Sequence, residues 1–389
     1  MNSENLNFAY LKNDLTPISF SYDDLLKKHL LVIGQTGSGK TTSVKAIVNE
    51  LQKINYTNII FDPTGEYDDY QNSIKMTLGK NTFIDISKLH AKELIKLIGL
   101  KTSVNVLNKM ELAINSLRIQ NNIKHKTGVY KKINKKWTDF NSDNERLKLF
   151  GYDYNVRLLA DQIVQEYVIP YADSKANYDY VGQELDYENI RRDWHEILAI
   201  KARVNDPKIV EFFNLKSHIK RAFKTELTFT IKQFEAAKSL HRSLVINLAP
   251  LQDFEHMQSE IISLLFKFVL LNRAKTEQRF PVTVVIDEAH RYLPKQSKLN
   301  HNGIFQVLRE GRKFGINLIV STQSPLDLPN RMRGQFSTLL VHEMSNEVEI
   351  QSILDTPDFI KEIRSLAVGE AQLTFKSRAR YSIIIEEPT

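Results

Sequence analysis

Cysteine is absent from this sequence of 389 residues, and glycine and proline are scarce, at 14 and 11 residues. Without cysteine the chain cannot form disulfides, a thiolate zinc site or a cysteine nucleophile. The scarcity of glycine and proline, with no internal repeat and no low-complexity linker, argues against a string of flexibly joined modules. The 10 histidines are not clustered at metal-ligand spacings.

Long hydrophobic runs are also missing. The most apolar helical run, residues 261–271, is too short to cross a bilayer and is interrupted by Lys267. The first residues, MNSENLNFAYLKND, carry acidic groups and no apolar stretch, so they match neither a secretory signal nor a transit peptide. We therefore expect a cytoplasmic protein without membrane association.

Charge is nearly balanced, with 53 Lys and Arg against 46 Asp and Glu and a net charge of +7. This small excess suits a polyanionic partner, although many proteins without such a partner share it. Hydrophobic residues make up 42% of the chain and charged residues 25%, which is typical of a chain that buries a core.

Continuous apolar runs recur at residues 31–34, 58–62, 243–248, 282–287 and 317–323. Such runs are typical of strands that are buried on both faces in a parallel sheet. Helical patterns follow at 41–54, 255–274 and 303–314, which is the βαβ alternation of a doubly wound fold. The sequence therefore predicts an α/β fold with a mainly parallel sheet, and three further strands in 339–344, 371–375 and 381–385, the last two as a hairpin.

About half of the chain separates the first two predicted strands from the third. This middle part has helical periodicity at first, as in AKELIKLIGL and NVLNKMELAINSLRI, and then becomes polar and rich in Tyr and Lys. We expect a first core segment at 1–100, an inserted and mainly helical subdomain at 101–240, and a second core segment at 241–389.

A complete Walker A motif, GQTGSGKT, follows the apolar strand HLLVI and opens a helical run. Both contexts are the ones this phosphate-binding loop requires. Its backbone N–H groups surround phosphates, Lys40 reaches the β and γ oxygens, and Thr41 is placed to bind Mg²⁺. We expect the nucleotide to contact Gly34, Gln35, Thr36, Gly37, Ser38, Gly39, Lys40, Thr41 and Thr42.

A second apolar strand ends in the acidic pair Asp287-Glu288, which is the Walker B pattern. We expect Asp287 to bind Mg²⁺ with Thr41, and Glu288 to act as the general base toward water. Gln323 ends a further buried strand, where its amide would sense the γ-phosphate or orient that water. A Glu directly after the Walker B Asp, with no Asn-Lys-x-Asp guanine motif, favours ATP over GTP.

Basic residues in the segment REGRKFG precede the strand that ends in Gln323. In a ring ATPase, a neighbouring subunit supplies a cation to the transition state, and arginine suits this role because of its fixed fork of donors. We expect Arg312 to be this trans finger, with Arg309, Arg331 and Arg333 as alternatives. A solvated basic helix end is the simpler interpretation.

The blocks HLLVIGQTGSGKTTS, IIFDPTGEY, SLVINLAPL, VVIDEAHRYLP, REGRKFGINLIVSTQSP and LAVGEAQL, in this order, resemble the HerA ATPases. The resemblance covers residues 16–100 and 240–387. It implies a RecA-like core of the FtsK/HerA group, a hexameric ring and ATP-driven translocation of double-stranded DNA.

Two features depart from that family. Thr64 stands where the family usually has His, although Asp62, Gly65 and Glu66 remain. HerA proteins usually begin with a small β-barrel, whereas 33 residues precede Gly34 here. We expect such a ring to dock its partners differently.

Two basic segments are candidates for contact with DNA phosphates. Lys295, Lys298 and His301 follow Walker B and would line a pore; a polar surface loop is the alternative. The stretch IKHKTGVYKKINKKW interleaves Tyr130 and Trp137 with six lysines, although charge runs are usually solvated faces. These lysines are Lys124, Lys126, Lys131, Lys132, Lys135 and Lys136.

Three functions remain open: a DNA-translocating motor, an ATP-dependent scaffold or switch that activates a separate effector enzyme, and a conjugation-type coupling ATPase. The last normally carries membrane helices. The resemblance implies a separate effector, a nuclease or a sirtuin-like enzyme, in DNA-end processing or antiphage defence.

Overall fold

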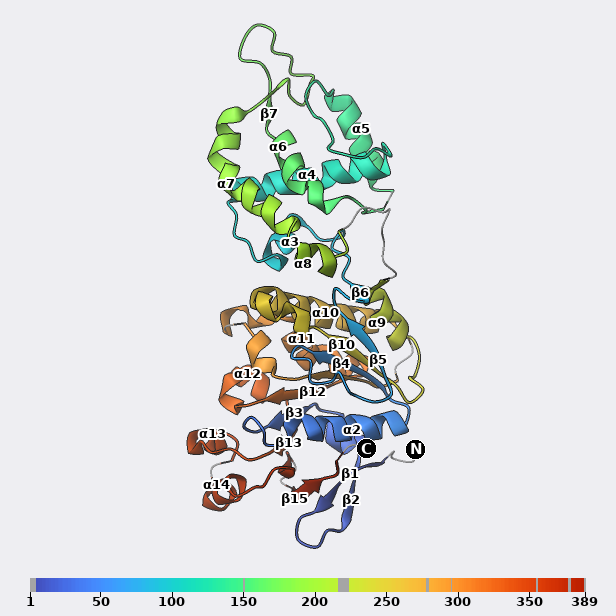
Figure 1. Ribbon diagram of the computed structural model, residues 1–389, viewed down its shortest axis with the longest axis vertical. Helices are drawn as coiled ribbons and strands as arrows, with labels where there is room; N and C mark the ends of the chain where they lie inside the picture. Colours follow the sequence, from blue (N-terminus) through green and yellow to red (C-terminus); the bar gives the residue numbers. More distant parts are fainter. Residues whose placement is uncertain are drawn as a thin grey trace. The chain divides into compact units, whose positions relative to one another are not determined.

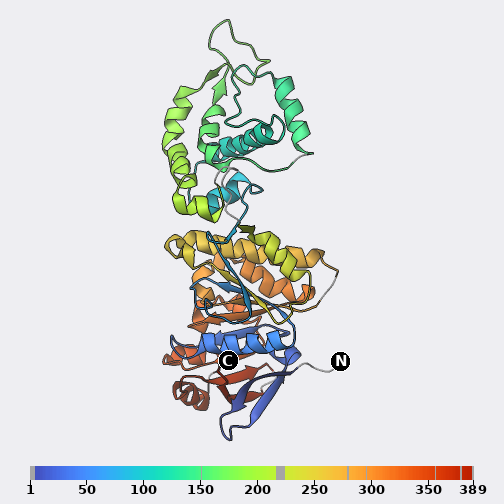
Figure 2. The same cartoon turned by 45° about the vertical axis from the view of Figure 1, so that its right-hand side comes forward.

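The computed structural model describes residues 5–149, 151–215, 224–277, 280–294, 296–354, 356–376 and 379–387. The chain forms two compact units (Figures 1 and 2). The first unit comprises Met1–Leu78 and Thr228–Thr389, and the second comprises Gly79–Leu227. The second unit therefore begins and ends earlier in the chain than the predicted inserted subdomain at 101–240.

An 11-stranded sheet forms the centre of the first unit within the described residues, in the order β2-β1-β15-β14-β13-β3-β12-β11-β4-β10-β5. The strands from β13 to β5 are parallel, and the other four are antiparallel. The parallel strands are β3 (Leu30–Ile33), β4 (Thr57–Asp62), β5 (Ser73–Thr77), β10 (Ser243–Asn247), β11 (Val282–Ile286), β12 (Ile316–Thr322) and β13 (Thr338–Val341). The antiparallel strands are β1 (Asn5–Leu11), β2 (Pro17–Ser21), β14 (Glu370–Phe375) and β15 (Arg380–Ile385).

The predicted parallel sheet and the β14–β15 hairpin are confirmed. Strands β1, β2 and β5 have no counterpart in the sequence analysis. None of the three is buried along its whole length, since each lies at or near an edge of the sheet. Without a continuous apolar run, such strands give only a weak pattern.

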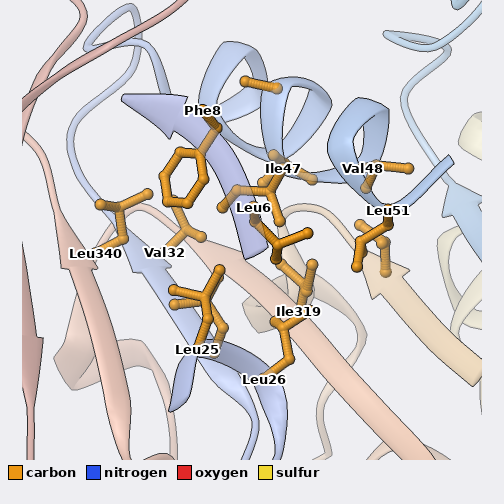
Figure 3. Close-up of a cluster of buried hydrophobic side chains, with 14 of the residues drawn as sticks. Leu6, Phe8, Leu25, Leu26, Val32, Ile47, Val48, Leu51, Ile319 and Leu340 are labelled. Carbon is orange, nitrogen blue, oxygen red and sulfur yellow. The ribbon is translucent and has the colours of Figure 1, made fainter. Parts of the chain in front are cut away.

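Helices cover both faces of the sheet. On one face, α2 (Lys40–Lys53) packs Ile47, Val48 and Leu51 toward Val32 and Ile319 of the sheet (Figure 3). On the other face, the rings of Phe61 in β4 and Phe266 in α10 lie 4.6 Å apart. In β4, Ile60 belongs to the core cluster that includes α2, whereas the next residue, Phe61, packs on α10, as burial on both faces requires. The remaining helices of this unit are α1 (Tyr22–Leu26), α10 (Glu255–Lys275), α11 (Gly303–Glu310), α12 (Asn330–Arg333), α13 (Glu347–Gln351) and α14 (Pro357–Arg364).

The predicted helix at 303–314 is shorter than expected, because α11 ends at Glu310 and a 3₁₀ turn, η6 (Gly311–Phe314), follows. A Cβ atom at Gly303 would lie 2.0 Å from the Ser263 carbonyl oxygen, so glycine is required where α11 crosses α10. Gly315, with φ 71°, ends the turn and leads into β12.

The second unit is mainly helical. Ser103 and Asp186 cap its two longest helices, α4 and α7, by accepting hydrogen bonds from Val106 and Asn189. Its helices are α3 (Ala91–Leu97), α4 (Val104–Asn122), α5 (Trp137–Leu147), α6 (Leu159–Gln165), α7 (Tyr187–Val204) and α8 (Pro207–Phe212). Helix α9 (Leu227–Glu235) leads from this unit back into the first.

Across the described ranges, we find no helix that combines the length and the hydropathy needed to span a membrane.

Candidate active site

The loop after β3 has the geometry of a phosphate-binding loop. Helix α2 begins at Lys40, and Gly39 precedes it in the left-handed region, with φ 101°. Gly37 also has a positive φ, of 82°. A Cβ atom at Gly34 would lie 2.6 Å from Cβ of His342. These glycines are therefore required by backbone shape or by close packing.

Lys40 is held inside this loop. Its Nζ donates to the Gln35 carbonyl oxygen at 3.1 Å and lies 4.0 Å from Oε1 of Glu288. The Lys40 side chain is 6% exposed. Ser38 donates to the same carbonyl at 2.8 Å. The cation is thus close to the loop and to the end of β11, where a β- or γ-phosphate would fit between them.

Three oxygen-bearing side chains converge at the start of α2. Oγ1 of Thr41 lies 2.6 Å from Oε2 of Glu66 and 3.1 Å from Oδ2 of Asp287. The single hydroxyl proton of Thr41 cannot balance the negative charge of two carboxylates. Mg²⁺ prefers oxygen ligands and would balance this charge, so the donor set fits the metal predicted for Thr41 and Asp287.

Glu66 is brought to Thr41 by the turn after β4. The buried carboxylate of Asp62 accepts hydrogen bonds from the backbone N–H groups of Gly65 at 2.8 Å, Glu66 at 3.1 Å and Tyr67 at 3.0 Å. Burial raises the pKa of Asp62, while these hydrogen bonds act in the opposite direction. Glu66 was not among the site residues predicted from the sequence, although its place four residues after a strand ending in Asp is a usable signal.

Glu288 lies at the centre of the polar cluster. Its backbone is in the left-handed region, with φ 48°, which is uncommon for a residue with a side chain. Gln323 donates to Oε2 of Glu288 at 3.2 Å, and Nδ1 of His290 lies 3.5 Å from the same oxygen. With Lys40 on the other oxygen, the carboxylate faces three groups that can hold it in place. His290 is a further residue that was not predicted from the sequence.

His342 packs against the phosphate-binding loop and the start of α2. Its Nε2 lies 2.9 Å from Oγ of Ser43, and its Nδ1 lies 2.9 Å from the Glu370 carbonyl oxygen. Burial lowers the pKa of His342 to about 4, so the ring is neutral at physiological pH. It thereby joins α2 to β14 without placing a second cation beside Lys40.

Arg312 lies at the amino ends of the parallel strands, whereas the Walker residues lie at their carboxyl ends, the opposite edge of the sheet. It precedes β12, whereas Gln323 follows it, and the seven residues of β12 span roughly 23 Å. An arginine side chain cannot cover that distance. Arg312 therefore does not reach the Walker residues of its own chain.

Among the four arginines considered, Arg312 has an exposed side chain that, within the described residues, makes neither a hydrogen bond, an ion pair nor a ring contact. Arg309 donates to Glu310, Arg331 lies over the ring of Phe305, and Arg333 donates to Asn330.

The candidate DNA contacts differ from one another. Lys295 and the side chain of Lys298 lie outside the described residues, and His301 is exposed. In the second basic segment, Lys132 pairs with buried Glu166, and Lys124 lies 2.6 Å from Asp143.

Lys135 lies 3.9 Å from Asp143, and Tyr130 is buried. Half of the six lysines therefore neutralise interior carboxylates of the second unit. Exposed basic groups remain at Lys126, Lys131 and Lys136, with Trp137 44% exposed.

Solved structures resemble nearly the whole chain. VirB4 of Thermoanaerobacter pseudethanolicus is 12% identical, with a TM-score of 0.62, over 98% of this chain and 96% of that one. The plasmid coupling protein TrwB in complex with ADP and Mg²⁺ is 12% identical, with a TM-score of 0.55, over 96% and 88%. These similarities confirm the fold of a P-loop ATPase with a largely parallel sheet.

Relatives in sequence are distant but extensive. The DNA double-strand break repair helicase HerA of Sulfurisphaera tokodaii is 24% identical over 89% of this chain and 62% of its own length. A probable DNA double-strand break repair helicase HerA of Methanocaldococcus jannaschii is 22% identical over 98% and 76%. The chain spans less than two thirds of the length of the first of these.

Family models match two parts of the chain. One, the zonular occludens toxin (Zot), matches residues 215–358. The other, described as the helicase HerA, central domain, matches residues 7–269, which is most of the chain. The predicted resemblance is thereby confirmed, and the chain belongs to the family of the HerA helicase central domain.

Proposed function

We propose that this protein is an ATP-hydrolysing motor that forms a hexameric ring, binds double-stranded DNA and moves it. The observation that carries the proposal is the division of the catalytic groups between two edges of one sheet. Lys40, Thr41, Asp287 and Glu288 meet at one edge, whereas Arg312 lies at the other. If Arg312 is the finger, one chain alone holds an incomplete site.

In the proposed reaction, the loop from Gly34 to Thr42 binds ATP, and Lys40 contacts its β- and γ-phosphates. Thr41 and Asp287 would hold Mg²⁺, with Glu66 within reach of the same position. The metal neutralises phosphate charge when bound. Glu288 accepts a proton from the attacking water, and Gln323 fixes the orientation of the Glu288 carboxylate.

A ring would complete the site. Arg312 is free to extend from its own subunit, and a neighbour that presents its Walker edge would receive it. An arginine supplied in this way typically accelerates phosphoryl transfer by ~10³- to 10⁵-fold. The fork of the guanidinium suits the equatorial oxygens of the transferred phosphoryl group.

Two kinds of relative support DNA as the partner. The HerA relatives are named as DNA double-strand break repair helicases, and TrwB is named as a plasmid coupling protein. Electrostatic tracking of phosphates needs cations without base readout, for which exposed Lys126, Lys131 and Lys136 are available. A separate nuclease or sirtuin-like effector, in DNA-end processing or antiphage defence, completes the proposal.

Subunit mixing tests the shared site. Arg312→Ala rings are expected to bind ATP normally but to turn over ~1000-fold more slowly, and Lys40→Ala rings to be inactive. Mixed rings should regain activity, because an intact Walker loop of one subunit meets an intact Arg312 of the next. Absence of rescue, with subunit exchange demonstrated, would refute the trans role.

Duplex DNA tests the motor. ATP turnover is expected to rise with duplex DNA, and the ring to displace a bound block from the duplex end in an ATP-dependent manner. Stimulation without displacement would instead identify an ATP-dependent scaffold or switch that activates an effector.

A further inference from the structure

The segment that carries Arg312 is fixed at both ends by one buried histidine. His29 is 0% exposed, and its Nε2 lies 3.0 Å from the carbonyl oxygen of Leu308, at the end of α11. The backbone N–H of Leu318, in β12, donates to Nδ1 of the same ring at 2.9 Å. One imidazole thus joins the two ends of the segment 308–318, which contains Arg312.

The protonation of His29 follows from these partners. A carbonyl oxygen requires a donor at Nε2, and a backbone N–H requires an acceptor at Nδ1, so the ring is the neutral Nε2–H tautomer. Burial lowers the pKa of His29 to about 4, and the charge of Arg312 acts in the same direction. At physiological pH the ring therefore holds both backbone groups.

A buried arginine binds the backbone in the middle of the same segment. Arg273, at the end of α10, is 1% exposed, and its Nε donates to the carbonyl oxygen of Phe314 at 3.3 Å. Its Nη2 donates to the carbonyl oxygen of Phe280 at 2.7 Å. The next residue, Gly315, accepts a hydrogen bond from Val282 at 2.9 Å. Several points of the backbone from 308 to 318 are therefore held by the rest of the first unit.

We propose that His29 and Arg273 are positioning residues for Arg312 and set where its guanidinium meets the neighbouring subunit. The inference rests on the proposed trans role of Arg312. The side chain of Arg312 is exposed and has no partner of its own among the described residues. The direction of its approach therefore depends on the backbone, and a misplacement of about 1 Å can cost roughly 100-fold in rate.

A change at His29 could also act on the Walker loop of its own chain. It directly precedes β3, which ends at Ile33, and Gly34 begins the loop. An effect transmitted through β3 would act in cis, on the site of the same subunit. An effect transmitted through Arg312 would act in trans, on the neighbour's site. Mixed rings separate these two routes.

The test uses His29→Leu, which removes both ring nitrogens but keeps an apolar side chain. Turnover of the pure variant is expected to fall by roughly 10- to 100-fold, with ATP affinity within about twofold of wild type. Mixing with excess Lys40→Ala subunits, which supply intact fingers, should raise turnover per His29→Leu subunit toward the wild-type value. A defect in the variant's own Walker loop would not be rescued by any neighbour.

A matched control separates positioning from general loss of stability. Gln52 is buried in α2, and its Nε2 donates to Ser243 at 2.8 Å and to the Asn72 carbonyl at 3.2 Å, away from the 308–318 segment. Gln52→Leu should lower the melting temperature as His29→Leu does, yet retain the wild-type turnover per folded subunit. Equal losses of turnover in both variants would overturn the inference.

The outcomes also separate this inference from the proposed function. If Lys40→Ala subunits rescue Arg312→Ala but not His29→Leu, the positioning role is wrong and the trans finger stands. If neither is rescued, the trans finger itself fails. Should His29→Leu not fold, Arg273→Lys carries the same test, because the single ammonium group of lysine cannot replace the separate Nε and Nη2 donors that bind the carbonyl oxygens of Phe314 and Phe280. Here too, rescue supports positioning and its absence refutes it.

Discussion

Replacing Glu235 by Gln is expected to stabilise the protein at alkaline pH and to leave its stability near pH 5 almost unchanged. Glu235 ends α9 and is 1% exposed. Its Oε2 accepts a hydrogen bond from Asn272 at 2.6 Å, and its Oε1 has no hydrogen-bond partner in the described part of the chain. Burial raises the pKa of Glu235 to about 8, and the Asn272 bond and the charge of Arg273 offset this only partly.

The sign and size of the effect follow from proton linkage. In the unfolded chain this carboxyl has its ordinary pKa of 4.5, whereas in the folded protein it keeps its proton to about pH 8. Between these values the folded state binds more protons, so stability falls by about 1.4 kcal/mol per pH unit. The loss across the window is on the order of 4 kcal/mol. Gln cannot ionise, so the variant lacks this slope.

Urea denaturation at pH 5, 6, 7 and 8 measures the difference in the free energy of unfolding. Both tryptophans, Trp137 and Trp194, lie in the second unit, so circular dichroism or hydrogen exchange of α10 is the appropriate probe for Glu235. The exposed Glu277→Gln serves as the control and should show the wild-type slope. Parallel pH profiles for wild type and Glu235→Gln would refute the buried neutral carboxyl.

Three further substitutions test the active site. Lys40→Ala should abolish hydrolysis and weaken ATP binding in calorimetry, since the phosphates lose their buried counter-cation; normal turnover would contradict the site. Glu288→Gln should preserve ATP binding and ring assembly but slow hydrolysis by at least ~100-fold in single-turnover assays; loss of ATP binding would instead make Glu288 structural. Glu66→Gln, which removes one of two carboxylates beside Thr41, should raise the Mg²⁺ concentration needed for half-maximal turnover by several-fold while ATP affinity in excess Mg²⁺ is unchanged; an unaltered Mg²⁺ requirement would place Glu66 outside the metal site.

The parallel sheet and its Walker motifs were determined by the sequence itself. The strands that carry them are buried on both faces, so they appear as continuous apolar runs, and the chemistry follows directly at their carboxyl ends. Thr41 and Asp287, far apart in the chain, meet because β3 and β11 are parallel strands separated only by β12. Both the local pattern and the strand direction follow from the sequence without knowledge of any tertiary contact.

Other features depended on contacts between distant segments. The role of Glu66 requires the Asp62 turn to aim it at Thr41, and no local pattern encodes that aim. The basic segment at 123–137 looked like a surface for DNA. The sequence does not distinguish a solvated lysine from one that, like Lys132, is paired with a buried carboxylate, here that of Glu166.

The arginine finger shows the same division. The sequence placed Arg312 before the strand that ends in Gln323, and strand direction alone puts the two residues at opposite edges of the sheet. Only the tertiary structure brought His29 and Arg273 to the backbone on either side of Arg312. These residues lie 283 and 39 positions away from Arg312 in the chain. Hydrogen bonds to backbone atoms use groups that every residue carries, so they leave no pattern in the sequence of the segment they hold.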